Sequence, residues 1–326
     1  MKVLVTGGAG YIGSHAVRQL IRSGHEPVVL DNLSKGHREA VKDVTLVETD
    51  LLDREGLARC FGEHKVDAVM HFAARSLVGE SMKVPYDYYE NNVTGSLNLF
   101  KAAMDVGVDK FIFSSTAAVY GQPDEVPILE TTTKAPLNVY GRTKLVIENM
   151  LEDFSNIYGI RYKALRYFNA AGADVAGDIG EDHTPETHLV PIIFQSVLGK
   201  RDKLCVFGGD YPTEDGTCIR DYIHVTDLAD AHVLALGDLA KGGASCAYNL
   251  GSEKGYSVLE IIRAASDVVG KPIEYDVAPR RAGDPAVLIA SSAKIQSELG
   301  WKPMFGISDI LASAWGFHQQ FPDGYR

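Results

Sequence analysis

A glycine-rich turn between an apolar strand and a helix constrains the fold of this chain more than any other feature. The apolar run Val3–Thr6 leads into Gly7, Gly10 and Gly13, which are spaced G-x-x-G-x-x-G and precede an amphipathic stretch. Glycine permits the tight turn and lets the backbone approach a pyrophosphate, toward which the helix points its N-terminal N–H groups. The pattern predicts a dinucleotide-binding turn; the alternative is a glycine-rich turn without a ligand.

Short apolar runs and amphipathic stretches alternate up to about residue 168. The predicted strands are Val3–Thr6, Pro27–Leu30, Thr45–Thr49, Ala68–His71, Phe111–Ser114 and Tyr162–Arg166, and the predicted helices include His15–Ser23, Asn91–Val106 and Tyr140–Tyr158. Such alternation is typical of a parallel sheet with helices on both faces, and near-continuous apolar strands fit burial on both sides. We therefore predict an α/β fold, with a Rossmann-type doubly wound parallel sheet formed by residues 1–168.

The second half of the chain does not show this regular alternation of strands and helices. Residues Asn169–Glu186 are rich in Gly, Asp, Ala and Pro and predict a long loop, and loops of that length in compact domains are usually functional. We expect residues 169–326 to form a smaller α+β lobe that binds a substrate. The segments Arg220–Leu236 and Ala247–Leu250 are regular enough to pack back on the first lobe.

Charge and composition exclude several classes of protein. The 326 residues carry a formal net charge of -11, which argues against nucleic acid or an anionic membrane as the main partner. The sequence contains no apolar run of about 18 residues that could span a bilayer. His183 and His188 lack metal-ligand spacing, so no metal is predicted. The cysteines form no C-x-x-C pair, which favours free thiols in the cytoplasm; they are Cys60, Cys205, Cys218 and Cys246.

Asp31 ends the second predicted strand and selects the cofactor. It lies 18 residues after Gly13, close to the spacing expected for a ribose-binding carboxylate. A carboxylate can accept hydrogen bonds from both ribose hydroxyls but repels a 2′-phosphate, so NAD is favoured over NADP. Lys35 and Arg38 lie nearby, and their positive charges would attract a 2′-phosphate, which weakens the preference for NAD.

Three residues form a candidate catalytic set. Tyr140 and Lys144 are spaced Y-x-x-x-K, which places both on one face of a helix, where the ammonium would favour a phenolate able to act as a general base. Thr116 follows the strand Phe111–Ser114, at the end of the sheet where ligands bind in such folds. The alternatives are a surface helix for the pair and an ordinary turn for Thr116. Their joint occurrence in this order favours the catalytic interpretation.

Longer motifs add a family resemblance that covers essentially the whole chain. They are Thr6–His15, Phe72–Ser81, Asn91–Val93, Ser114–Gly121, Tyr140–Lys144, Arg166–Asp174, Phe207–Val225 and Arg280–Asp284. With these motifs the chain resembles the extended short-chain dehydrogenase/reductase family and, within it, the UDP-galactose 4-epimerases. The resemblance implies interconversion of UDP-glucose and UDP-galactose through transient oxidation at C4 by tightly bound NAD. It also implies a homodimer formed through the Tyr140 helix and its neighbour Asn91–Val106.

The resemblance further assigns binding residues. Those implied to contact NAD, besides the glycines, Tyr140 and Lys144, are Tyr11, Ile12, Asp31, Asn32, Asp50, Leu51, Phe72, Ala73, Asn91, Ser114 and Phe168. Those implied to contact the UDP-sugar are Thr116, Asn169, His188, Leu189, Val206, Phe207, Arg220, Arg281, Asp284 and Leu288. Two arginines can clamp a pyrophosphate.

Alternatives remain open for several of these residues. Arg220 could instead pair with Asp221 or Glu214, Arg281 could pair with Asp284, and Leu288 could be a core leucine. Two positions also depart from a common form of the family pattern. Ser76 stands where some members carry lysine, and His188 stands where some carry asparagine.

Two rival functions can be weighed from the residues. A nucleotide-sugar 4,6-dehydratase needs an acid/base pair beside the threonine, but Ala117 and Ala118 occupy those positions and offer no proton donor. A non-catalytic NAD-sensing scaffold would not need the intact set Thr116, Tyr140 and Lys144. A turnover assay on UDP-galactose separates this scaffold from an enzyme.

Overall fold

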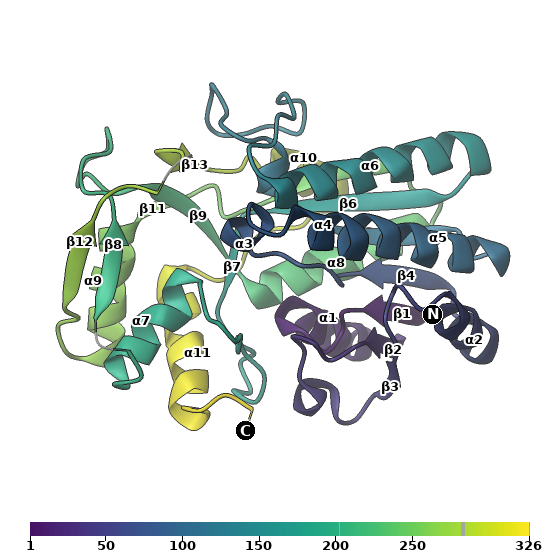
Figure 1. The fold of residues 1–326 in the computed structure, drawn as a ribbon, viewed down its shortest axis with the longest axis horizontal. Helices are drawn as coiled ribbons and strands as arrows, with labels where there is room; N and C mark the ends of the chain where they lie inside the picture. The colour runs from purple at the N-terminus through teal and green to yellow at the C-terminus, as the bar shows by residue number, and fades with distance from the viewer. Residues whose placement is uncertain (202, 282–283, 326) are drawn as a thin grey trace.

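The computed structural model describes residues 1–201, 203–281 and 284–325. They form a large parallel sheet with helices on both faces and a smaller group of strands and helices beside it (Figure 1). Ala282 and Gly283, inside the predicted motif Arg280–Asp284, lie outside the described residues. The predicted α/β class is confirmed.

The large sheet has seven parallel strands in the order β10-β6-β5-β4-β1-β2-β3. Apart from β10 this is the strand order of dinucleotide-binding sheets, and it reverses between β1 and β4. The bounds are β1 Lys2–Thr6, β2 Glu26–Asp31, β3 Thr45–Glu48, β4 Ala68–His71, β5 Lys110–Thr116, β6 Arg161–Tyr167 and β10 Cys246–Leu250.

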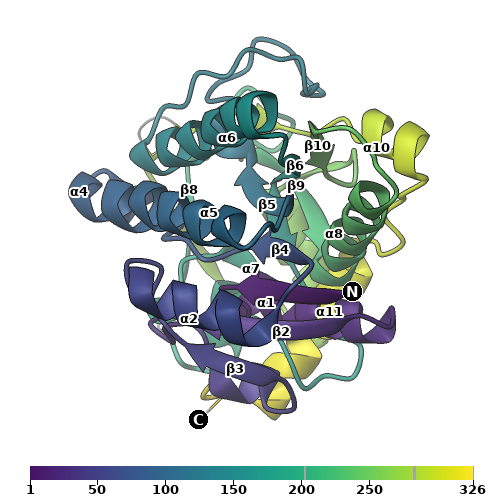
Figure 2. The same ribbon diagram turned by 90° about the vertical axis from the view of Figure 1, so that its right-hand side faces the viewer.

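Helices cover the sheet on both faces (Figure 2). One face carries α1 (Tyr11–Arg22) and α8 (Val225–Ala240), and the other carries α2 (Arg54–His64), α5 (Gly95–Asp105) and α6 (Val139–Tyr158). Successive strand residues face opposite sides, so Val3 and Val5 join the core under α8 whereas Leu4 joins the core under α2 and α5. None of the helices in the described part of the chain is long and apolar enough to cross a membrane.

The predicted helix Asn91–Val106 is divided in the structure. A π-helical turn, η2 (Tyr89–Thr94), precedes α5, and the buried Asn92 in this turn donates to the carbonyl of Arg75 and to the hydroxyl of Thr143. The remaining short elements of this half are η1 Arg38–Val41, α3 Val78–Ser81, α4 Pro85–Tyr88 and η3 Ala117–Val119.

The smaller lobe is built from two short sheets and packed helices. One sheet contains β7 (Asn169–Ala171), β9 (Ile219–His224), β11 (Gly255–Ser257) and β13 (Val287–Leu288), and the other pairs β8 (Leu204–Phe207) with β12 (Tyr275–Ala278). Its helices are α7 Leu189–Val197, α9 Val258–Val269 and α11 Ile307–Gln320, and α10 Ala293–Leu299 lies against β10. Both α8 and β10 follow residue 168 in the chain but belong to the large sheet layer. The division of the chain at residue 168 stays a prediction.

Candidate active site

The glycine-rich turn joins β1 to α1. Gly7 has a φ of 69°, and a Cβ on it would lie 2.5 Å from the backbone nitrogen of Ala73, whereas a Cβ on Gly13 would lie 2.1 Å from the carbonyl oxygen of Gly7. Neither position can accept a larger residue without moving the backbone. Gly10 is the N-cap of α1 and offers no side-chain cap, and the first turn contains no acidic residue. The N–H groups at this helix end are therefore suited to an anion.

Asp31 is held rigidly beside this turn. Its Oδ2 accepts a hydrogen bond from the backbone nitrogen of Ala9 at 3.0 Å, and its Oδ1 accepts one from Leu33 at 2.9 Å. Burial raises the pKa of Asp31, while these two backbone hydrogen bonds act in the opposite direction. Each carboxylate oxygen has further acceptor capacity, so the group can also bind hydroxyls. The structure thus places Asp31 where a ribose next to the pyrophosphate turn would lie.

The other residues predicted to contact NAD gather at the same end of the sheet. Tyr11 and Ile12 begin α1, Asn32 follows β2, Asp50 and Leu51 follow β3, Phe72 and Ala73 follow β4, Ser114 lies near the end of β5, Asn91 lies in η2 and Phe168 follows β6. In parallel sheets ligands bind beyond the carboxyl ends of the strands, where the strand order reverses. The predicted set therefore lies at the end of the sheet where a dinucleotide would bind.

Thr116 and Tyr140 meet where β5 ends and α6 begins. The Thr116 hydroxyl accepts the backbone N–H of Ala118 at 3.1 Å, so the turn considered as an alternative does form. The same side chain is also hydrogen-bonded to Tyr140. Asn138 caps α6 by accepting the N–H of Gly141 at 2.8 Å, which fixes the first turn of the helix and with it the phenol.

Lys144 lies one turn further along α6, on the same face. Its Nζ is 6.0 Å from the centre of the Tyr140 ring and donates a hydrogen bond of 2.7 Å to the carbonyl of Ser114. Burial lowers the pKa of Lys144 to about 7, against the attraction of Glu148. Burial also raises the pKa of Tyr140 to about 12, although the hydrogen bond with Thr116 opposes it. In the protein by itself the phenol is therefore protonated near neutral pH, because its desolvation outweighs the stabilisation of a phenolate expected from Lys144.

A buried ion pair supports this set and was not identified from the sequence. Arg166 on β6 donates from Nε to Glu148 on α6 at 2.8 Å and from Nη2 at 2.6 Å, and both side chains are 5% exposed. Ser115 donates to the same carboxylate at 2.6 Å, and the Tyr120 hydroxyl accepts from Arg166 at 2.8 Å. Glu148 follows Lys144 by four residues, and this spacing on one helix face could have identified it from the sequence.

Apart from Thr116 on β5, the predicted UDP-sugar residues lie on the smaller lobe. Arg220 pairs with Asp284, and the Arg281 guanidinium stacks 4.1 Å from the centre of the Phe207 ring. Asp221 is not the partner of Arg220 because it points to the other side of the strand, where it accepts from Ser252. Among the described residues, Arg281 thus keeps a guanidinium that no carboxylate neutralises.

Four further predicted residues differ in what they can contact. The Val206 side chain is 1% exposed and belongs to the core, so only its backbone could meet a ligand. Asn169 donates to the carbonyl of Asp221 at 3.2 Å. Leu288 lies opposite Arg220 on β13 and packs with Phe168 against one small apolar cluster. Leu189 begins α7, next to the site.

His188 has a different environment from the other predicted substrate residues. It is the N-cap residue of α7, and its Nδ1 faces the carboxylates of Glu181 and Glu186 at 2.7 Å and 3.4 Å. The spacing of these residues in the sequence did not predict this grouping. His188 thus pairs with Glu181 and Glu186 and does not lie in the predicted arginine clamp.

Comparisons with known proteins agree with this geometry. A model of the NAD dependent epimerase/dehydratase family matches residues 3–251. A UDP-glucose 4-epimerase of Halalkalibacterium halodurans is 53% identical over 100% of this chain and 98% of its own length. A crystal structure of a UDP-glucose 4-epimerase, 52% identical, superimposes with a TM-score of 0.98 over 100% of both chains. The Bifidobacterium longum UDP-glucose 4-epimerase in complex with NAD+ and UDP, 39% identical, gives a TM-score of 0.95 over 100% of both chains. The chain belongs to the NAD dependent epimerase/dehydratase family.

Proposed function

We propose that this protein interconverts UDP-glucose and UDP-galactose by transient oxidation at C4 of the sugar, using tightly bound NAD. The observation that carries the proposal is that Thr116, Tyr140 and Lys144 lie at the same end of the large sheet as the glycine-rich turn and Asp31. The UDP-glucose 4-epimerases to which the chain is similar over their full length support the same substrate pair.

The described residues fit NAD at the carboxyl end of the sheet. The uncapped start of α1 suits the pyrophosphate, and the fixed carboxylate of Asp31 suits a ribose with free hydroxyls. Bound NAD would serve as acceptor and donor of the C4 hydride, and its positive charge would favour a phenolate at Tyr140. A cofactor that is regenerated in each cycle never needs to leave, which fits tight binding.

The residues of the chain move the proton and hold the sugar. Tyr140 as phenolate takes the proton from the 4-hydroxyl while Thr116 holds that oxygen, and the C4 hydrogen leaves as hydride. The resulting 4-keto sugar turns over while its UDP stays anchored near Arg220 and Arg281. Tyr140 then returns the proton to O4 as hydride adds to the opposite face of C4. No net oxidation occurs.

An elimination reaction is not supported by this site. The helical turn η3, directly after Thr116, contains Ala117, Ala118 and Val119, none of which titrates. Loss of the C6 oxygen needs a proton donor at this point. The site therefore favours epimerisation over 4,6-dehydration.

The proposal is tested by adding UDP-galactose to purified protein without added NAD and following both UDP-sugars by NMR of the anomeric protons. We expect conversion to an equilibrium mixture, and we expect NAD in the supernatant of the denatured protein. No turnover even with added NAD would contradict the function. Recovery of NADP would contradict the role of Asp31 alone.

Leu288 is expected to limit the size of the sugar 2-substituent. It pairs with Arg220 between β13 and β9 and packs against the same apolar cluster as Phe168, so a larger side chain would take up space near these predicted binding groups. Leu288→Tyr should lower kcat/KM for UDP-N-acetylgalactosamine relative to UDP-galactose by a factor of roughly 10–200. Leu288→Met, which conserves volume, is the control. An unchanged ratio in the tyrosine variant would show that Leu288 is only a core residue.

We also propose that the protein is a cytoplasmic homodimer that pairs through α5 and α6. Exposed apolar side chains on these helices support this face as the interface; they are Leu97, Ile157 and Tyr158. The four cysteines are all free, which fits a reducing compartment. Light scattering of purified protein should give twice the mass of the chain, and Ile157→Asp should reduce that mass.

A further inference from the structure

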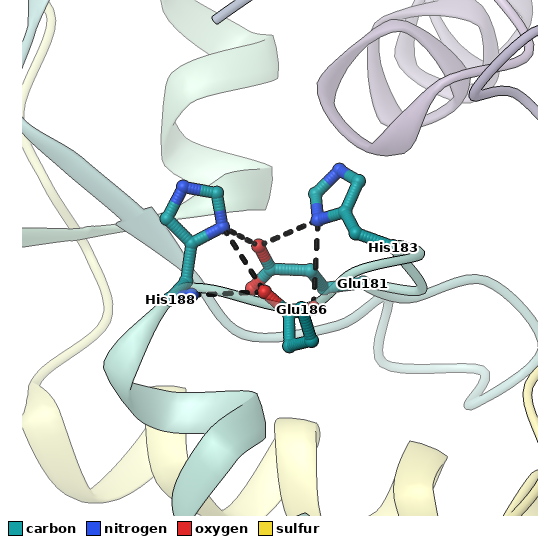
Figure 3. Close-up of side chains that lie close together, drawn as sticks. All are labelled: Glu181, His183, Glu186 and His188. Carbon is teal, nitrogen blue, oxygen red and sulfur yellow. Dashed lines mark hydrogen bonds and ion pairs between the residues drawn. The ribbon is translucent and has the colours of Figure 1, made fainter. Parts of the chain in front are cut away.

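Four metal-ligating side chains converge in the loop that leads from β7 into α7. Glu181, His183, Glu186 and His188 each direct one nitrogen or oxygen atom to a common point, and these atoms all lie within 4.8 Å of one another (Figure 3). The close-up shows the two imidazole rings on either side of the two carboxylates. The residues alternate acid and histidine within eight positions, but only the folded loop turns all four inward.

The distances between these atoms are those of neighbouring ligands around one ion. Nδ1 of His183 lies 3.3 Å from Oε1 of Glu181 and 3.5 Å from Oε2 of Glu186. Nδ1 of His188 lies 2.7 Å from Oε1 of Glu181 and 3.4 Å from Oε1 of Glu186. Zinc binds imidazole and carboxylate at about 2.0–2.2 Å, so adjacent ligand atoms in a tetrahedral site are about 3.4 Å apart. With Oε1 of Glu181 and Oε2 of Glu186 as the ligand atoms, both separations from His183 match this value, and the separation of His188 from Glu181 is shorter.

Hydrogen bonding among the described residues does not satisfy the cluster. Oε1 of Glu186 accepts the backbone N–H groups of Thr187 at 2.7 Å and His188 at 2.9 Å, which fixes the carboxylate. Its other oxygen, Oε2, and Nδ1 of His183 are both buried and have no hydrogen-bond partner of acceptable geometry. Glu186 is only 5% exposed. Buried polar atoms without partners are costly, so their common direction indicates a missing shared partner.

The two carboxylates of the cluster are almost closed to solvent. The Glu181 and Glu186 side chains are 5% and 2% exposed, and a buried carboxylate is stable only when it is paired or coordinates a metal. With a divalent cation bound, two carboxylates and two neutral imidazoles would balance its charge.

We propose that Glu181, His183, Glu186 and His188 bind one zinc ion. The hard ions Mg²⁺ and Ca²⁺ prefer oxygen ligands, so a site with two imidazole nitrogens is unsuited to them. Two nitrogen and two oxygen ligands suit a tetrahedral zinc ion. All four positions of the ion are filled by protein atoms, so the site is structural and has no open position for a catalytic water.

The zinc site would join the two lobes next to the cofactor turn. The Tyr11 ring, at the start of α1, packs edge-on against His183 with ring centres 6.3 Å apart, and its hydroxyl donates to the carbonyl of Gly172 at 2.7 Å. His188 directly precedes α7. An ion at this place therefore fixes the long loop between β7 and α7 against the first helix of the large sheet.

The test measures zinc directly on tag-free full-length protein. Both the parent and all variants carry Cys205→Ser, because Cys205 is the exposed thiol and could bind zinc on its own. After removal of metal with a chelator, the protein is dialysed against low-micromolar free zinc, and the metal is counted by mass spectrometry. We expect one zinc per chain and a higher Tm than in the metal-free protein. Cobalt should give the intense visible absorption of a tetrahedral site.

Matched variants assign the ion to this cluster. His183→Asn and Glu186→Gln should lose the bound zinc and the zinc-dependent rise in Tm, whereas His64→Asn, on α2, should keep both. Less than about 0.1 zinc per chain in the parent, with no zinc-dependent shift in Tm, would overturn the proposal and leave two histidine–glutamate ion pairs. Equal zinc in the parent and both cluster variants would also overturn it. If a variant does not fold, the zinc and cobalt titrations of the parent decide alone.

Discussion

Replacing Tyr140 by phenylalanine should lower kcat for UDP-galactose by roughly 10²–10⁴-fold, the usual contribution of a positioned acid/base group. The substitution removes the hydroxyl that takes the proton from O4 and keeps the ring that packs at the start of α6. Phenylalanine also cannot hydrogen-bond to Thr116. The measurement is the initial rate at saturating UDP-galactose, with NAD content determined for each preparation.

The Tyr140→Phe substitution should lower kcat without changing the affinity for UDP. Tyr140 lies at the start of α6, whereas Arg220 and Asp284 lie on the smaller lobe. The Kd for UDP should therefore stay within about twofold of the wild-type value, the scatter expected for a distant site. The matched control is Tyr86→Phe, on α4 at a residue that is 71% exposed, which removes a tyrosine hydroxyl outside the helices α5 and α6 of the proposed dimer face and should keep full activity. Near-normal turnover by Tyr140→Phe would mean that another group is the base.

Glu148→Ala should lower the free energy of unfolding by about 3–5 kcal/mol, because it leaves the guanidinium of Arg166 buried without a counter-charge. The two side chains are each 5% exposed and share two hydrogen bonds, and Ser115 and Tyr120 depend on the same pair. Urea unfolding followed by circular dichroism should show the loss as a lower midpoint. Since Glu148 also faces Lys144, the variant should lose activity as well.

The control for this prediction lies one turn further along α6. Glu152 is exposed, so Glu152→Ala should change the free energy of unfolding by less than about 0.5 kcal/mol. The double variant Glu148→Ala with Arg166→Met should recover part of the lost stability, because the buried guanidinium is then no longer left without its carboxylate. If Glu148→Ala and Glu152→Ala unfold at the same urea concentration, the Glu148–Arg166 pair does not contribute to the stability of the protein.

The large sheet and its dinucleotide turn could be predicted from local sequence. Apolar runs such as Val3–Thr6 and Phe111–Ser114 are buried on both faces and therefore leave a continuous signal that does not depend on partners. The steric demands at Gly7 and Gly13 are equally local, because they arise within one strand–turn–helix unit. The Y-x-x-x-K spacing likewise placed Lys144 on the face of Tyr140 before any tertiary contact was known.

The smaller lobe was predicted only in outline, because its strands are short and its contacts join distant segments. Arg220 and Asp284 are 64 residues apart, and nothing near either residue in the sequence identifies the other as its partner. The seventh strand of the large sheet, β10, likewise joins it 79 residues after β6 ends.

The sequence by itself determined the fold class, the cofactor turn and the identity of the candidate acid/base set, since each rests on residues close together in the chain. Only the tertiary structure decided the ionisation of that set. The pKa of Tyr140 rises and that of Lys144 falls because distant elements bury both groups, and burial is a property of the packed molecule. The same holds for Glu181, His183, Glu186 and His188. Their spacing carries no metal signature, and the loop backbone alone brings their ligand atoms to one point.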